Sequence, residues 1–276
     1  MSASALVSSA RKAWAFVRRD FSTEASYRLS FVMQLVQVAF VALLAYFMAQ
    51  FLRQKGLEAV TPFAQDYFSF VILGLAFYDY QSTAQNGFAH SLLEGQMTGT
   101  LETLLVTQTS LEMVMLGSSL YRFVSTTLRL AGYLLFGVLL FGMPLAGANW
   151  GAAFVLLVLS VVAFSAFGFF SACFVLLFKK GDPVSWILLG ASGVLGGVLY
   201  PVSSLPPWLG KLAQLLPITH ALEGERRALL AGAGLGELQR EAFILLLFAA
   251  VGLPLALAAF RWSVRRAKRT GTLAQY

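Results

Sequence analysis

Two charged side chains lie inside long apolar stretches of this sequence. Asp79 lies in the stretch 67–88 and Arg129 in the stretch 120–143. A charge at membrane depth is costly, so it is expected to pair with an opposite charge or to face a watery cavity. The sequence therefore predicts an ion pair between Asp79 and Arg129 that holds the two stretches together as a unit. In the alternative, Arg129 extends to the inner headgroups and Asp79 faces a cavity alone.

The polar segment 92–110, LLEGQMTGTLETLLVTQTS, is the second candidate site. It contains Glu94 and Glu102 but no lysine or arginine. Lipid electrostatics favour basic residues at the cytoplasmic surface of a membrane. An acidic segment on that side is better suited to contact with another protein than to contact with lipid.

The same segment contains signals for helix ends. Ser91 and Glu94 have the spacing of a capping box, and so do Thr109 and Glu112, which predicts a helix start at each point. Glycines at 95 and 99 allow a turn between the two helices.

Sequence motifs for catalysis and for nucleotide or metal binding are absent. No GxxxxGK[ST] phosphate loop occurs, so ATP and magnesium are expected on a separate chain. His90 and His220 lack a metal-ligand spacing, and Cys173 is the single cysteine. The segment 190–194, GASGV, is not a GxSxG motif. We expect no catalytic residue, metal ligand or cofactor in this chain, and an intramembrane hydrolase or transferase is the enzyme alternative.

The composition indicates an all-α integral membrane protein with six transmembrane helices. Of the 276 residues, 58% are hydrophobic and 12% are charged, about half the usual charged fraction of a soluble domain. Several apolar runs approach the roughly 20 residues that a helix needs to cross a bilayer. The predicted spans are 29–52, 67–88, 120–143, 150–178, 184–200 and 242–260.

The distribution of basic residues predicts cytoplasmic N- and C-termini. Basic residues are concentrated before the first span, at Lys179 and Lys180 after the fourth span, and in the tail after Phe260. With six spans, these three regions lie on one side, which the positive-inside rule assigns to the cytoplasm. The predicted organisation is a cytoplasmic interface region (1–28), a membrane domain (29–260) and a basic cytoplasmic tail (261–276).

The segment 8–21 has the pattern of an amphipathic helix. Ala10, Trp14, Val17 and Phe21 recur at helical spacing, and basic residues lie toward the other side. We expect this helix to lie in the inner membrane interface. The alternative is a solvated basic tail.

The connection after the fifth span is the most irregular part of the sequence. The span 184–200 supplies only about 25 Å of helix, less than the roughly 30 Å hydrocarbon layer. Breaks at four prolines then predict re-entrant or surface-lying helices, which act either as an outer gate or as a passive cap. These prolines are Pro201, Pro206, Pro207 and Pro217.

Gly193 and Gly197 form a GxxxG motif in the fifth span. Small residues allow helices to approach closely. The contact is either with a helix of the same chain or with a second copy.

GTLETLLVTQTS at 99–110, preceded by Glu94, resembles the motif between the second and third spans of ABC type-2 transporter permeases. The segment 200–232, which begins YPVSSLPPWLG, resembles that family's signature after the fifth span. One departure is Gln108, which follows Thr107 where the family usually has proline.

The resemblance implies a subunit of an ATP-driven exporter in the bacterial inner membrane. Its partners would be a separate ABC ATPase subunit and a second permease copy or paralogue, without nucleic acid. The substrate would be a hydrophobic or amphipathic drug, a lipid or a saccharide, and a membrane scaffold or assembly factor with the same fold is the alternative. The resemblance assigns these residues to an ATPase-coupling loop: Glu94, Gly95, Gly99, Thr100, Leu101 and Glu102.

Overall fold

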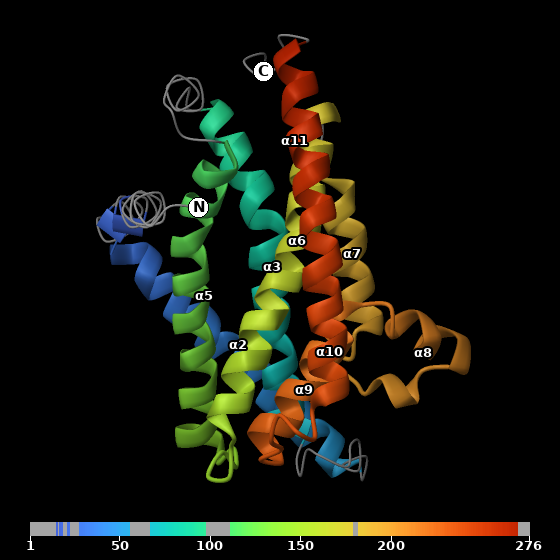
Figure 1. Ribbon diagram of the computed structural model, residues 1–276. Helices are drawn as coiled ribbons and strands as arrows, with labels where there is room; N and C mark the ends of the chain where they lie inside the picture. Colours follow the sequence, from blue (N-terminus) through green and yellow to red (C-terminus); the bar gives the residue numbers. More distant parts are fainter. Residues whose placement is uncertain are drawn as a thin grey trace.

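The computed structural model describes residues 28–55, 67–97, 111–178 and 182–269, together with five residues between 15 and 22. The long helices lie side by side in a bundle (Figure 1). No described residue lies in a strand, in agreement with the all-α prediction. The elements are α2 (Arg28–Gln54), α3 (Tyr67–Met97), α5 (Leu111–Phe141), α6 (Trp150–Phe178), α7 (Pro183–Leu195), the 3-10 helix η1 (Val202–Ser204), α8 (Pro207–Ala213), α9 (Pro217–Leu230), α10 (Gln239–Leu247), the π-helical segment η2 (Phe248–Gly252) and α11 (Leu253–Arg269).

Among the described residues, four helical stretches are long and apolar enough to cross a membrane. They are Val32–Gln54, Met113–Phe141, Trp150–Phe178 and Gln239–Arg269. The other two predicted spans correspond to α3 and α7. Helix α3 has 31 residues but carries many polar side chains. Helix α7 has 13 residues, or about 20 Å, which is shorter than the hydrocarbon layer.

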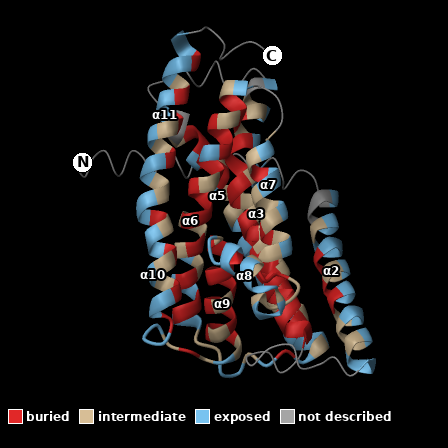
Figure 2. Cartoon of the chain, turned by 90° about the vertical axis from the view of Figure 1, so that its right-hand side faces the viewer, coloured by how far each residue is buried: buried red, intermediate tan, exposed pale blue. Residues whose placement is uncertain are grey.

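The outer surface of the bundle is apolar, as contact with lipid requires. Phe47 of α2, Leu139 of α5 and Phe243 of α10 are each at least 65% exposed. Exposed residues follow one another along α2, α10 and α11 in Figure 2. Apolar surface of this extent is unusual on a soluble monomer and is typical of a surface that lipid or protein covers.

Helix α3 lies at the centre of the bundle, in contact with both α5 and α6. A Cβ atom at Gly168 of α6 would lie 2.2 Å from the carbonyl oxygen of Ala84, so the two backbones touch. The rings of Phe88 and Phe169 stack 4.3 Å apart next to this contact. Because helices surround the middle of α3, several of its polar side chains are buried there, among them Ser69, Gln81 and Gln85.

The helix α3 continues to Met97, past the predicted end at residue 88. Ser91 therefore does not cap a new helix, and its hydroxyl donates to the carbonyl of Gly87 at 2.8 Å, one turn earlier. Gly95 is also helical, so the predicted turn at this residue is wrong. A serine followed by glutamate three residues later also occurs within helices, where the hydroxyl bonds the preceding turn.

The last helical stretch also extends beyond its prediction. A π-helical turn precedes Pro254 in α11, and such a turn accommodates a residue that has no backbone N–H. Phe260, Ser263 and Ala267 are buried at helical spacing, and α11 packs on α6. The predicted basic tail is therefore helical from residue 261 to Arg269, because the buried face of α11 continues to pack on α6.

Near the N-terminus, the five described residues between 15 and 22 are helical. The ring centroid of Phe21 lies 6.4 Å from that of Tyr121 in α5. The remainder of the predicted amphipathic helix lies outside the described residues.

After α7 the chain forms an arm that projects from the bundle, made of η1 and α8 (Figure 1). It then returns as α9, which packs against α3, α6 and α10. The prolines lie where these short helices start: Pro201 precedes η1, Pro206 and Pro207 open α8, and Pro217 opens α9. Proline suits the first helical turn because its missing N–H has no partner there in any case.

The GxxxG glycines contact residues of the same chain. A Cβ atom at Gly193 would meet the ring of Tyr78 at 3.6 Å, and Gly197 lies past the end of α7 with φ +80°. Helix α7 ends at Leu195, earlier than the predicted end of the fifth span at residue 200.

Candidate functional site

The structure brings Asp79 and Arg129 together. The Nε of Arg129 donates to Oδ2 of Asp79 at 2.8 Å, and Nη2 lies 3.4 Å from Oδ1. Nη2 also donates to the hydroxyl of Thr126 at 3.0 Å. The two side chains are 20% and 26% exposed, so the pair is partly removed from solvent. This two-pronged contact favours the ion-pair interpretation over a lone Arg129 that extends to the headgroups.

A polar cavity of about 250 Å³ lies beside this pair, between α2, α3 and α5. Its walls include Arg129 and the hydroxyl and amide groups of Gln34, Thr83 and Asn86. Thr83 is hydrogen-bonded to Thr126 at 3.0 Å, which extends the polar contact between α3 and α5. A polar cavity at this depth accounts for the partial exposure of the two charges.

Glu94 takes part in a second ion pair between α3 and α5. Its Oε2 accepts from Nη2 of Arg122 at 3.2 Å. Arg122 precedes Arg129 by two turns of α5, so two ion pairs join the same two helices at two levels. Sequence analysis missed Arg122. The available signal was a basic residue near the start of the helix that follows the acidic segment.

Two of the six predicted coupling residues lie in the structure. Glu94 and Gly95 are in the last turn of α3. Gly99, Thr100, Leu101 and Glu102 lie outside the described residues.

Arg226 of α9 hydrogen-bonds to the irregular chain after α7 and holds it against the bundle. Its guanidinium donates to the carbonyls of Phe70, Gly197 and Val198 at 2.8–3.2 Å. It also lies 3.4 Å above the centre of the Phe70 ring, a favourable cation–π position. The next carbonyl, of Leu199, accepts from the Tyr67 hydroxyl at 2.8 Å. Side chains thus take the place of helical hydrogen bonds where the chain turns.

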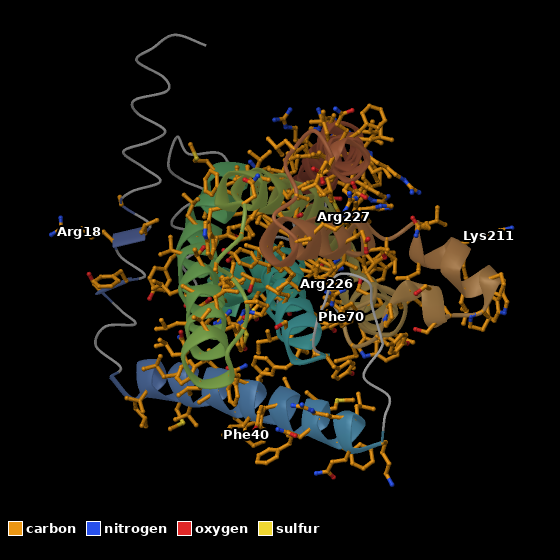
Figure 3. All side chains as sticks on the ribbon, turned by 90° about the horizontal axis from the view of Figure 1, so that it is seen from below. Arg18, Phe40, Phe70, Lys211, Arg226 and Arg227 are labelled. Atoms are coloured by element: carbon orange, nitrogen blue, oxygen red, sulfur yellow. The ribbon has the colours of Figure 1, made fainter. Side chains whose placement is uncertain are left out.

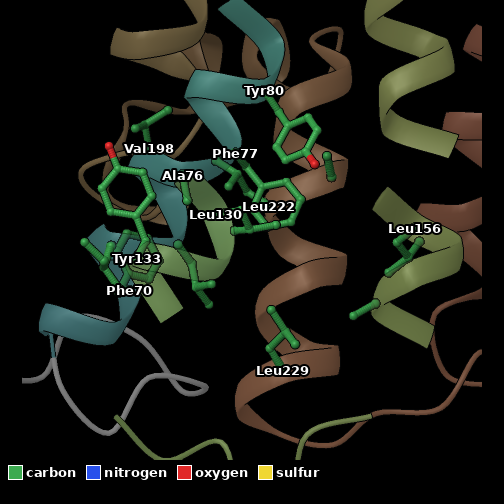
Figure 4. Packing of buried hydrophobic residues seen from close by; sticks show 14 of the residues in the cluster. Phe70, Ala76, Phe77, Tyr80, Leu130, Tyr133, Leu156, Val198, Leu222 and Leu229 are labelled. Carbon is green, nitrogen blue, oxygen red and sulfur yellow. The ribbon is translucent and has the colours of Figure 1, made fainter. Parts of the chain in front are cut away.

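The absence of a side chain at Gly74 lets α3 approach the backbone that follows α7. A Cβ atom at Gly74 would lie 2.1 Å from the carbonyl oxygen of Val198. Close approach of the two backbones therefore requires glycine here. Figure 4 shows Phe70, Val198 and Leu222 in the apolar cluster around this contact.

Glu225 is the buried acid of α9. It is 1% exposed, and neither carboxyl oxygen has a hydrogen-bond partner among the described residues. Burial raises the pKa of Glu225 well above its usual range. Desolvation penalises the ionised form, so burial favours the protonated, neutral form of this side chain.

The raised pKa of Glu225 predicts the effect of Glu225→Gln. Between the lower pKa of the unfolded chain and the raised pKa of the folded one, the folded protein binds more protons, so its stability falls as pH rises. Glutamine does not titrate. The variant should therefore gain thermal stability relative to the wild type as pH rises from 5 to 8, measured by unfolding in detergent. A constant difference across that pH range would show that Glu225 is ionised in the fold.

Comparisons with known proteins agree with this architecture. Residues 38–230 match a family described as ABC-2 type transporter. A stretch of 163 residues is 27% identical to the inner membrane transport permease YadH of Escherichia coli K12, and the Shigella flexneri protein of the same name matches equally. The match covers 58% of this chain and 62% of the relatives, so it spans less than two thirds of their length.

Proposed function

Because this chain belongs to the ABC-2 type transporter family, we propose that it is the membrane permease of an ATP-driven exporter. The observation that carries the proposal is the family match, which runs from within α2 to the end of α9. The apolar exterior and the polar central helix α3 support it, because a permease must be stable in lipid and still offer polar groups inside. We place the chain in the bacterial inner membrane with both termini in the cytoplasm.

The proposed energy source is a separate ATPase chain that binds ATP and magnesium. Its contact with the permease is the segment 92–110, whose acidic and apolar residues suit a protein groove. Glu94 of this segment pairs with Arg122 of α5. Arg129, two turns further along α5, pairs with Asp79 of α3. A displacement of the segment would therefore move α3 and α5 together.

The proposed transporter contains two permease copies, or this chain with a paralogue. Large apolar side chains are exposed along α2, α5 and α11, which suits contact with lipid and with a second permease. ATP binding would shift the pair between inward-open and outward-open states. The proposed substrate class comprises hydrophobic or amphipathic drugs, lipids and saccharides.

Charge reversal in the coupling segment tests this function. The double variant Leu101→Ala with Glu102→Lys should lose the ATPase activity that copurifies with the tagged wild-type permease from its own organism. The reason is that the variant removes an apolar contact and inverts a charge at the proposed interface. The measurement is ATP hydrolysis in the purified fraction.

The matched control is Glu58→Lys, which changes the same charge in the connection on the opposite side of the membrane. This variant should retain the copurifying activity. Equal ATPase recovery from both variants would contradict coupling through 92–110. Labelling of a cysteine at Thr103 by an impermeant reagent outside intact cells would contradict the orientation.

A further inference from the structure

A cavity of about 670 Å³ lies between the projecting arm and the bundle. Its walls come from the end of α7, from α8, from α9 and from the first turn of α10. The volume falls within the range of small-molecule sites. In the proposed orientation, this cavity lies on the outer side of the membrane.

The side chains of this cavity carry a net positive charge. Four cations and two carboxylates line it, so the formal charge of its walls is +2. The carboxylate of Glu241 is held by Arg227 at 3.2 Å. Burial raises the pKa of Glu223, the other acid, and the neighbouring arginines partly offset this rise. The cations are Lys211, Arg226, Arg227 and Arg240.

Two of the four cations are available to a ligand. The guanidinium of Arg226 is occupied by backbone carbonyls, and Arg227 is paired with Glu241. Lys211 and Arg240 have no hydrogen-bond or ion-pair partner among the described residues, and both are exposed. Figure 3 shows Lys211 on the projecting arm, apart from Arg226 and Arg227 in the bundle. A bound anion would therefore meet one cation from α8 and one from α10.

An apolar surface adjoins this cationic cavity. Helix α8 turns Gly210, Lys211 and Gln214 toward the cavity. Trp208 and Leu212 lie one turn apart on α8 and are 64% and 45% exposed, and Leu215 just beyond its end is 68% exposed. The arm thus has a polar face toward the cavity and an apolar face beside it.

We propose that this cavity binds the phosphoryl headgroup of an amphipathic anion, whose apolar chain lies along the exposed face of α8. The proposal rests on the proposed permease function and narrows its substrate class to anionic amphiphiles. Lys211 of α8 and Arg240 of α10 contact the phosphoryl oxygens. A neutral saccharide would leave both charges without a partner, and a free anion would leave the apolar face without one.

Titration of the purified full-length protein with dihexanoyl phosphatidylglycerol tests the proposal by calorimetry. Lys211→Glu and Arg240→Glu should each weaken binding about five- to tenfold, because each replaces an attractive charge with a repulsive one. Lys55→Glu is the matched control, since Lys55 is an exposed base at the end of α2 outside the cavity. Its affinity should stay within about twofold of the wild type. Dihexanoyl glycerol and inorganic phosphate serve as the uncharged and the headgroup-only probes.

Two results together support the proposal. Phosphatidylglycerol binds far more tightly than dihexanoyl glycerol or inorganic phosphate, and its affinity falls on reversal of either cavity charge but not in the Lys55→Glu control. Equal binding of dihexanoyl glycerol, equal binding of inorganic phosphate, or no effect of either reversal overturns it. Equal thermal unfolding of the three variants shows that the fold is retained. The assay requires no ATPase, so its failure leaves the permease function standing, and loss of ATPase association leaves the cavity result standing.

Discussion

Replacing Arg226 with methionine is expected to destabilise the protein by about 3 kcal/mol or more. Methionine fills a similar volume but donates no hydrogen bond. The carbonyls of Gly197 and Val198 would then remain buried without the donor that they have in the fold. Each unsatisfied buried polar group costs about 1–3 kcal/mol. Thermal unfolding of the purified variant in detergent measures the loss.

Two further variants separate the geometry of Arg226 from its charge. Arg226→Lys keeps the positive charge but cannot reach three carbonyls at once, so it should recover only part of the stability. Arg240→Met removes an exposed arginine from the wall of the same cavity and should cost less than about 1 kcal/mol. An unfolding temperature of Arg226→Met equal to that of Arg240→Met would show that Arg226 does not fasten the arm.

The role of Arg226 could not be predicted because its partners are remote in sequence. Phe70 lies 156 positions away. In the sequence, Arg226 counts only as one of several bases offset by nearby glutamates. The signal that exists is indirect: a glycine pair, Gly196 and Gly197, ends an apolar run and leaves carbonyls that need donors.

Local sequence patterns predicted the bounds of a helix well where a single physical requirement determines them. Helix α6 begins at Trp150 and ends at Phe178, as predicted, because an uninterrupted apolar run admits only a spanning helix. The four prolines between α7 and α9 also mark helix starts. At Ser91 and Glu94 the capping pattern failed, because packing of α3 against α5 and α6 continues the helix past a local stop signal.

The acidic segment 92–110 is a second case in which a local sequence pattern did not reveal a contact with a distant residue. Glu94 stands out in the sequence because no base lies between 92 and 110. In the fold its counter-ion is Arg122, which lies 28 positions later on the neighbouring helix. Part of the acidic character of the segment is thus neutralised within the chain.

Removing either charge of the Asp79–Arg129 pair is expected to cost about 3 kcal/mol or more, because the remaining charge loses its partner at membrane depth. Asp79→Asn and Arg129→Met should therefore both reduce the yield of monodisperse protein and its unfolding temperature. The charge swap, Asp79→Arg with Arg129→Asp, should recover part of that loss. A coupling energy of about 1–3 kcal/mol between the two positions is expected from the double-mutant cycle.

The pair between Glu94 and Arg122 provides the matched comparison, because it joins the same two helices. Its side chains are 60% and 29% exposed, so its coupling energy should stay below about 1 kcal/mol. Failure of the swap to recover any stability would contradict pairing between Asp79 and Arg129. Recovered stability without recovered transport would assign the pair a role beyond holding α3 to α5. In that case the orientation of the two charges toward the polar cavity matters, and not only their attraction.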